Sequence, residues 1–299
     1  MNIILKTLSG SRLYGTHNED SDYDYRGIGI QGLNHILGFM PVIGQQSGAG
    51  DDVVYDIKKF FELASKCNPN IVEILYAPER FWVKQTDIGE ALVASRHMFL
   101  STKARHTFSG YAHAQLKRMR GHKKWLVDPP THQPTREEYC LPKNHKVIPN
   151  ITPELLNKLA MSPAVPEELR SLLLLEYKYQ QALKKWDGYV QWLDNRNPAR
   201  AKLEAEYGFD GKAGSHLIRL MRSCVEILRD GELCVVRPDA TELKDIRSGK
   251  WSYEEVLEHA EDLDEQAEVW YHKSPLPRNV NINRLNSLCS TLIMEHHGL

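Results

Sequence analysis

The sequence has little cysteine, and the cysteines it has follow no pattern. They are odd in number and widely spaced, and no two form a CxxC pair: Cys67, Cys140, Cys224, Cys234 and Cys289. We therefore expect neither a disulfide framework nor a cysteine-based zinc site. This cysteine usage favours a reducing, cytoplasmic setting.

Long apolar runs are also missing. No stretch approaches the ~18 apolar residues that a transmembrane helix needs. Residues 1–6 lack the basic segment of a signal peptide, and polar residues interrupt the chain by Thr7. We expect a protein that does not bind membranes. The chain has 299 residues, of which 41% are hydrophobic and 26% charged. At roughly 100–200 residues per domain, it has room for two globular domains.

Neither sign of charge is in excess, because 38 Lys and Arg stand against 39 Asp and Glu. Such a balance argues against nucleic-acid binding, but the charges are segregated along the chain. Residues 96–146 carry eleven Lys and Arg and only three Asp and Glu, a local balance of +8. Acidic residues crowd the distant segment 254–268. A polyanion is expected to bind the first region and to be repelled by the second.

The hydrophobic pattern predicts an α/β part followed by a helical part. Strands are expected at 2–8, 22–30 and 52–55, and a helix at 57–65; segment 71–76 is too short to classify. Later helices are expected at 88–95, 104–119, 167–194, 213–230 and 253–271. Residues 128–149 hold five of the fifteen prolines and predict a long loop.

The residues most suggestive of chemistry lie in segment 10–27, GSRLYGTHNEDSDYDYRG. Asp22 and Asp24 are two apart on an expected strand, so their side chains share one face with Cα atoms roughly 6.5–7 Å apart. Their carboxylates can converge on Mg²⁺, which takes one or two carboxylates plus substrate phosphates. The preceding Gly10-Ser11 turn offers backbone N–H groups and a hydroxyl to a phosphate. Each part alone is common, but together they form a specific pattern.

This combination resembles the signature of the polymerase-beta-type nucleotidyltransferase superfamily. The longer match, GSRLYGT and SDYDYRG followed by VVYDIKKFF and NPNIVEILY, is similar to the branch of RNA-ligase-associated nucleotidyltransferases of RNA repair. It continues into GYAHAQLKR, HKKWL and GKAGSHLIRL, and so covers most of the chain. The resemblance implies an α+β protein. A small mixed-sheet, palm-like catalytic domain is expected at 1–95, and a larger α-helical domain that binds substrate and nucleotide at 96–299.

The implied activity is transfer of a nucleoside monophosphate from an NTP to an acceptor hydroxyl, with release of pyrophosphate. Two Mg²⁺ ions are expected, with Mn²⁺ as a substitute. The implied acceptor is an RNA end, in particular a tRNA 3′ end, and an RNA ligase of the same pathway is an implied partner. The reaction would be an in-line displacement at the α-phosphorus.

The resemblance assigns Gly10 and Ser11 to the triphosphate and Asp22 and Asp24 to the metals. It also calls for a third carboxylate on a later strand, the natural general base toward the attacking hydroxyl.

Four residues compete for that third role. Asp52 opens the strand at 52–55 and is the first choice, as metal ligand and catalytic residue; Asp56 is the second. Asp51 and Glu73 remain open. Asp56 is equally well placed to be the N-cap of the following helix.

A basic stripe is predicted on the helix at 213–230 or just before its start. Lys212, His216 and Arg219 fall at i, i+4 and i+7, so they share one face and are expected to reach the nucleotide phosphates. The alternative is a solvated face. Arg26 lies two residues beyond Asp24 and is expected to orient the carboxylates or to contact a phosphate. It could equally pair with a nearby acidic residue, Glu19 or Asp20.

The basic segment is our candidate RNA-binding surface, because cations follow a phosphate backbone and rings stack on bases. The residues assigned to it are Lys117, Arg118, Lys123, Lys124 and Trp125. An ordinary solvated helix face is the alternative. Six histidines in this region show no compact ligand spacing, so we expect no zinc site there.

Two rival functions remain open. The chain could nucleotidylate a protein hydroxyl, as antitoxins of the nucleotidyltransferase type do, or it could be a non-catalytic nucleotide- or RNA-binding module. An intact Asp22–Asp24 pair argues against the second, because a silent fold has no need of two convergent carboxylates.

Overall fold

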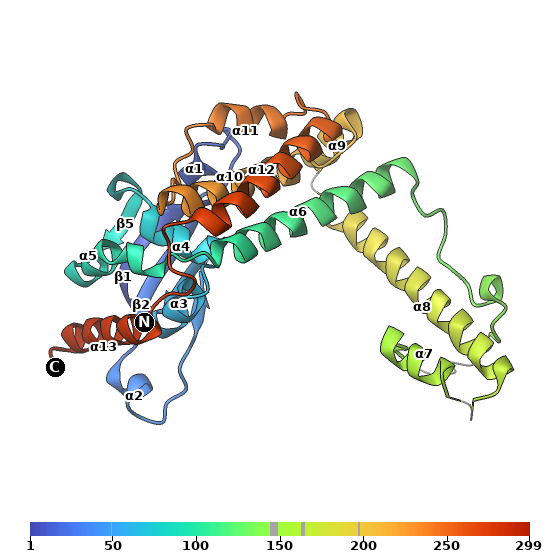
Figure 1. Ribbon diagram of the computed structural model, residues 1–299, viewed down its shortest axis with the longest axis horizontal. Coiled ribbons are helices and arrows are strands. Elements are labelled where there is room, and N and C mark those ends of the chain that lie inside the picture. Colours follow the sequence, from blue (N-terminus) through green and yellow to red (C-terminus); the bar gives the residue numbers. More distant parts are fainter. Residues whose placement is uncertain (49, 144–148, 163–164, 197) are drawn as a thin grey trace. The chain divides into compact units, whose positions relative to one another are not determined.

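The computed structural model describes residues 1–48, 50–143, 149–162, 165–196 and 198–299, except for the side chains of residues 160, 199 and 200 (Figure 1). Residues 144–148 of the predicted loop at 128–149 lie outside the described residues. They include His145 and Lys146 of the basic segment. The chain forms two compact units. The sheet unit comprises Met1–Arg120 and Asp210–Leu299, and the helical unit comprises Gly121–Phe209. Among the described helices, none combines the length and the apolar character needed to cross a membrane.

The sheet unit contains a five-stranded mixed sheet of order β3-β4-β2-β1-β5. Its strands are β1 (Asn2–Ser9), β2 (Asp24–Ile30), β3 (Gln45–Ser47), β4 (Asp52–Asp56) and β5 (Trp82–Gln85). β2 runs parallel to β4, and the other neighbours are antiparallel. The predicted α+β class is confirmed. The strand expected at 22–30 begins only at Asp24, so Asp22 lies in the loop before it.

Helices pack on the sheet through a continuous apolar core. The helices nearest the sheet are α1 (Gly10–Tyr14), α2 (Leu33–Ile36), α3 (Ile57–Ala64), α4 (Pro69–Tyr76) and α5 (Asp87–Ala94). Leu5 and Ile28 are paired across β1 and β2, and both are buried in one cluster with Phe60 of α3. The unclassified segment 71–76 belongs to α4, which begins with an Asn68 cap and Pro69 in its first turn.

The C-terminal helices complete the same unit. They are α10 (Gly211–Asp230), α11 (Ala240–Arg247), α12 (Tyr253–Lys273) and α13 (Ile282–His297). α10 packs against α11 and α12, and α13, which the sequence did not predict, packs against α3 and α5. Leu285 and Leu292 of α13 lie in the core cluster of the sheet. The observed units therefore differ from the expected domains 1–95 and 96–299. The reason is that helices from the C-terminal part of the chain pack their apolar faces against elements from its N-terminal part.

The helical unit is built from the end of α6 (Ala104–Val127) with α7 (Pro153–Ala160), α8 (Glu167–Asp194) and α9 (Pro198–Tyr207). The described residues also form short 3₁₀ turns at Glu79–Phe81, Arg96–Phe99 and Glu137–Tyr139. Within the helical unit, the Trp125 ring lies 5.3 Å from that of Trp192 and 5.9 Å from that of Tyr189. Arg136 donates to both oxygens of the buried Glu176 carboxylate, at 3.0 and 2.7 Å.

Candidate active site

A cavity of about 250 Å³ lies in the sheet unit where β1 ends and β2 begins. It gathers side chains from α1, β2, α10 and the end of α11, although these elements are far apart in the sequence. The residues lining it are Ser9, Gly10, Ser11, Tyr14, Thr16, Asp24, Arg26, Asp51, Asn70, Lys212, Ser215, His216, Arg219 and Arg247. All six residues predicted to bind nucleotide, Gly10, Ser11, Arg26, Lys212, His216 and Arg219, thus line this cavity.

Gly10 and Asp24 are in direct contact. The β1–β2 ladder pairs Ser9 with Asp24, which places the Asp24 carboxylate beside the first residue of α1. Gly10 has φ +63°, and a Cβ atom added there would lie 2.0 Å from Oδ2 of Asp24. Glycine is required here for two reasons: the left-handed backbone and the space that the carboxylate occupies.

Asp24 carries negative charge in an unfavourable environment. Its partial burial raises the pKa of its carboxyl, and the neighbouring carboxylates of Asp51 and Asp22 raise it further. Arg26 and Lys212 act in the opposite direction but do not restore the ordinary pKa value. A carboxyl group whose pKa is raised by neighbouring carboxylates is typical of functional sites, because a bound cation relieves the repulsion.

Arg12 fixes the loop that carries Asp22. Its guanidinium donates to the backbone carbonyl of Ser21 at 2.7 and 3.1 Å and to that of Asp22 at 3.3 Å. It also lies over the ring of Tyr23, 3.8 Å from the ring centroid. Asp22 itself is exposed. Although Asp22 is not on the strand, the loop is held close enough for its charge to act on Asp24.

The three neighbouring candidates for the third carboxylate lie in different places. Asp51 lines the cavity with Asp24. Asp52 pairs with Tyr25 across the parallel β2–β4 ladder, so its side chain points to the opposite face from Asp24. There it accepts from Lys6 at 2.6 Å. Asp56 is buried, caps α3 through the backbone N–H of Lys58, and accepts from Gln31.

The remaining candidate, Glu73, is buried in α4 and accepts from Tyr14 and Arg219. The structure therefore places Asp51 with Asp24 in the cavity lining, leaves Asp22 exposed in the loop before β2, and places Asp52, Asp56 and Glu73 in contact with other partners.

The predicted stripe on α10 reaches the cavity, but its charges differ from expectation. Lys212, His216 and Arg219 all line it. Burial, with the nearby charges of Arg219, Lys212 and Arg118, lowers the pKa of His216 to about 3. His216 is therefore neutral at physiological pH and offers a hydrogen bond rather than a charge. Arg26 also lines the cavity; it donates to the backbone carbonyls of Tyr25, at 2.9 Å, and Asp51, and neither predicted acidic partner is among its described contacts.

Sequence reasoning missed several residues of the cavity wall. Arg247 ends α11, and its guanidinium lies 3.4 Å from the Thr16 carbonyl. Nothing in its local sequence distinguished it from other surface arginines. Asn70 and Ser215 were missed too, although both lie inside segments that carry the family resemblance.

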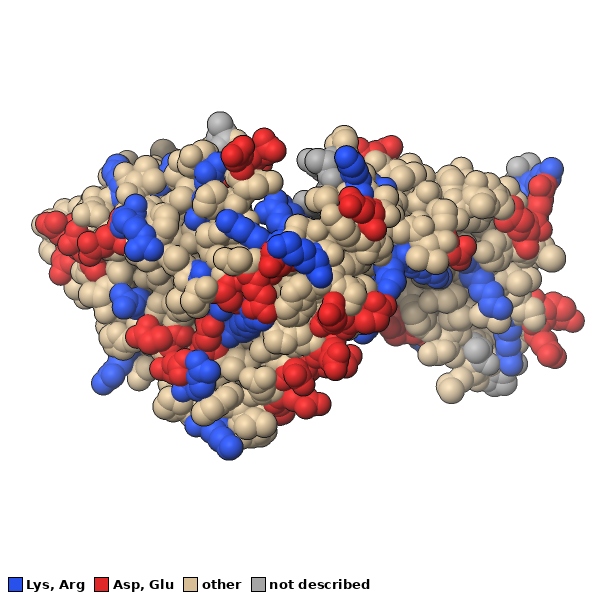
Figure 2. Space-filling view, turned by 90° about the horizontal axis from the view of Figure 1, so that it is seen from above, with Lys and Arg blue, Asp and Glu red and all other residues tan. Residues whose placement is uncertain are grey.

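The candidate RNA-binding residues all lie on α6, and several have protein partners. Arg118 lies 3.6 Å from Asp210, and Trp125 belongs to the aromatic cluster of the helical unit. The acidic segment is distant in sequence but not in space, because Arg105 pairs with Asp264 and Glu268 of α12 at 3.0 and 3.1 Å. Figure 2 likewise shows Lys and Arg interleaved with Asp and Glu on the visible face. The segregation of charge along the chain is thus only partly a segregation on the surface.

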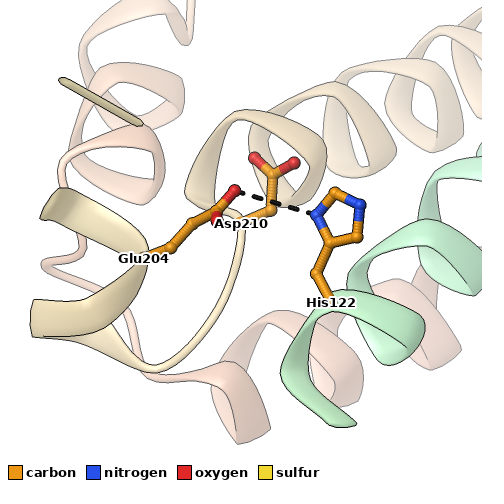
Figure 3. Close-up of side chains that lie close together, drawn as sticks. All are labelled: His122, Glu204 and Asp210. Atoms are coloured by element: carbon orange, nitrogen blue, oxygen red, sulfur yellow. Dashed lines mark ion pairs between the residues drawn. The ribbon is translucent and has the colours of Figure 1, made fainter. Parts of the chain in front are cut away.

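One histidine of the basic segment does meet a carboxylate. In the helical unit, Nδ1 of His122 lies 3.7 Å from Oε1 of Glu204, and Figure 3 shows the imidazole facing this carboxylate. Oε2 of Glu204 also binds Arg196 at 2.7 Å. Because the Arg196 guanidinium already balances the buried carboxylate charge, we interpret this contact as a structural ion pair.

The sequence of the chain is similar to those of known proteins. The sequence profile described as the RNA repair pathway DNA polymerase beta family (RlaP) matches residues 1–274. The chain is also similar, at 24% identity over 354 aligned positions, to a 38.9 kDa protein of Enterobacteria phage T4. That protein, from the nrdC-mobD intergenic region, is described as uncharacterized; the alignment covers 99% of this chain and 98% of the phage protein. No solved structure matches.

Proposed function

Because the chain belongs to the RNA repair pathway DNA polymerase beta family, we propose that it transfers a nucleoside monophosphate from an NTP to an acceptor hydroxyl. The observation that carries the proposal is the cavity in which Asp24 and Asp51 face Lys212, Arg219 and Ser11. Nucleotidyl transfer needs carboxylates to bind a metal and cations to bind a triphosphate. Both kinds of side chain line this cavity.

The donor set of the cavity fits Mg²⁺. Asp51 lines the cavity with Asp24, and Asp22 lies in the loop just before β2, where its charge acts on the Asp24 carboxyl. Hard carboxylate oxygens are the ligands that Mg²⁺ and Mn²⁺ prefer. We propose that Asp22, Asp24 and Asp51 hold the metal, with Asp51 taking the role of third carboxylate. When bound, Mg²⁺ would neutralise charge that develops on the phosphate oxygens.

The residues of the chain then have distinct tasks. Gly10 and Ser11 hold the triphosphate through backbone N–H groups and the hydroxyl. Lys212, Arg219 and Arg26 balance its charge, and neutral His216 donates or accepts one hydrogen bond. Asp51 accepts the proton of the attacking hydroxyl. That oxygen forms a bond to the α-phosphorus as the bond between the α-phosphorus and the bridging oxygen breaks, and pyrophosphate leaves.

We propose an RNA end as the acceptor, in particular a tRNA 3′ end. The membership of the family in an RNA repair pathway supports RNA over a protein acceptor. The test uses Mg²⁺, each α-³²P-labelled NTP in turn, total tRNA, cleaved RNA and a protein extract. Label in RNA supports the proposal and names the nucleotide. Label in protein alone would show that the acceptor is a protein hydroxyl and not an RNA end. No label in any pool would contradict the proposed transferase activity.

Gly10→Ala is expected to lower transfer about 10²-fold, because the new methyl group would displace the Asp24 carboxylate by about 1 Å. Some stability is lost as well, about 1–2 kcal/mol, since alanine at positive φ is strained. Gly208→Ala is the matched control. Gly208 also has positive φ, +77°, but within the described chain no atom lies within 4 Å of its added Cβ. Equal activity losses in the two variants would show that backbone strain alone is responsible.

Whether the basic face of α6 binds RNA is tested by the dependence of RNA affinity on salt concentration. The variant combines neutral replacements of Lys117, Arg118, Lys123 and Lys124, and RNA affinity is measured over a series of salt concentrations. If these residues contact phosphates, the slope of log affinity against log salt becomes shallower by about 0.7 for each lost contact with single-stranded RNA. The control neutralises four exposed lysines elsewhere: Lys58, Lys84, Lys244 and Lys273. Identical slopes for the two variants would rule out a specific role for α6.

A further inference from the structure

A buried trio of Tyr14, Glu73 and Arg219 lies at the wall of the cavity, and Tyr14 and Arg219 belong to its lining. Nη1 of Arg219 donates to Oε1 of Glu73 at 2.5 Å, and both side chains are only 3% exposed. The Tyr14 hydroxyl donates to Oε2 of the same carboxylate at 2.6 Å. The guanidinium carbon of Arg219 also lies 3.9 Å from the centroid of the Tyr14 ring.

These contacts fix the orientation of the guanidinium. Glu73 holds one of its edges, and the Tyr14 ring covers one of its faces. A planar group held at an edge and a face has little rotational freedom left, so its other donors point in set directions. Both oxygens of Glu73 are occupied, which explains why this carboxylate, a candidate third metal ligand in the sequence, serves a different purpose.

The other donors of Arg219 are unsatisfied. Within the described part of the chain, neither Nε nor Nη2 has a hydrogen-bond partner, although both atoms are buried. Buried donors without acceptors destabilise a fold, and such groups in proteins usually await a ligand or an ordered solvent molecule. Arg219 lines the cavity together with Ser11 and Lys212. An anion in the cavity would therefore supply the missing acceptors.

We propose that Tyr14 and Glu73 are positioning residues that hold Arg219 as a clamp for the pyrophosphate end of the nucleotide. The proposal rests on the proposed nucleotidyl transfer, whose leaving group is pyrophosphate. Phosphate oxygens match the spacing of guanidinium donors, which form paired charge-assisted hydrogen bonds with them. The proposed metal-binding carboxylates, Asp22, Asp24 and Asp51, are assigned to the α-phosphate and its metal. This leaves Arg219, with its charge already oriented by Glu73, for the phosphates that depart.

The first test compares two inhibitors that share the cavity. Competition by inorganic pyrophosphate and by a nucleoside monophosphate is measured in wild type and in Arg219→Lys, which keeps the charge but loses the planar set of donors. The clamp predicts that inhibition by pyrophosphate weakens about 10- to 100-fold, as expected for lost charge-assisted hydrogen bonds, while inhibition by the monophosphate changes little. The matched control is Arg222→Lys on the same helix. Arg222 is ion-paired with Asp239 and Glu242 and does not line the cavity.

Tyr14→Phe gives the second test, because it keeps the ring and removes only the hydrogen bond to Glu73. This variant should raise the KM for the NTP several-fold, lower kcat less, and weaken pyrophosphate inhibition more than monophosphate inhibition. Equal weakening of both inhibitors, or none, would overturn the clamp even if Arg219→Lys failed to fold.

Direct calorimetry with pyrophosphate, in the absence of any acceptor, separates the clamp from the reaction. If wild type binds pyrophosphate and Arg219→Lys does not, the clamp stands even if no transfer is ever detected. If transfer is detected and both proteins bind pyrophosphate equally, the clamp is wrong and the transferase stands.

Discussion

Asp24→Asn should abolish nucleotide transfer and leave the protein at least as stable as wild type. The amide keeps the shape of the side chain but is a poor ligand for a hard cation. Loss of a metal-binding carboxylate removes several kcal/mol of transition-state stabilisation, so the rate should fall about 10³-fold or more. The measurement is the single-turnover rate with saturating NTP and Mg²⁺.

The stability of this variant follows from the direction of the pKa shift. Burial and the charges of Asp51 and Asp22 raise the pKa of Asp24 in the folded protein. A group with a raised folded pKa favours folding while it is protonated, and this contribution is lost as pH rises through the folded pKa. At neutral pH the ionised Asp24 is therefore unfavourable to folding, and the uncharged amide removes that penalty. The Tm of Asp24→Asn relative to wild type should rise from acidic to neutral pH.

The control for Asp24→Asn is Asp20→Asn, which changes an exposed carboxylate in the loop that precedes β2. It should leave both rate and Tm close to wild type. If Asp24→Asn transferred nucleotide at the wild-type rate, the assignment of the cavity as an active site would be wrong. If it instead lost stability at neutral pH, the carboxylate would have a structural role that its environment does not indicate.

The elements around the cavity were predictable because their determinants are local. Alternating residues define β1 and β2, and the short connection between them brings Gly10 against Asp24 once the two strands pair. The sequence pattern that joins Gly10-Ser11 to the aspartates therefore has a direct structural cause. α8 (Glu167–Asp194) was predicted to the residue, because a long amphipathic stretch follows an acidic first turn.

The features that were not predictable depend on contacts between distant segments. The neutral state of His216 arises chiefly from the burial of its side chain, and then from the charges of Arg219, Lys212 and Arg118, the last of which comes from the distant α6. α13 lacks a strong local signal, and its apolar residues become a core face only when the sheet is present. The same holds for Arg247, which reaches the cavity from the end of α11. Composition also gave no warning that Arg105 would pair with the acidic segment.

The choice between Asp51 and Asp52 shows how one residue of register decides a site. Both precede the same apolar run, and the sequence favours Asp52 because it opens the strand. Successive residues of a strand point to opposite faces. Once β4 pairs with β2 so that Asp52 lies beside Tyr25, Asp51 falls on the side of Asp24. Asp52 is left with Lys6, whose ammonium group lies 5.3 Å from the Tyr25 ring centroid on that other face.

This register leads to the last prediction, a comparison of Asp51→Asn with Asp52→Asn. Asp51→Asn should lower the transfer rate about 10²- to 10⁴-fold, the usual contribution of a general base, and leave Tm nearly unchanged because the side chain is exposed. Asp52→Asn should lose the ion pair with Lys6, cost about 1 kcal/mol or less of stability, and retain transfer within about threefold of wild type. The two variants carry the same chemical change at adjacent positions, so each is the control for the other. The opposite ranking, with Asp52→Asn inactive and Asp51→Asn active, would restore Asp52 as the third carboxylate and require β4 to shift by one residue against β2 when the substrate binds.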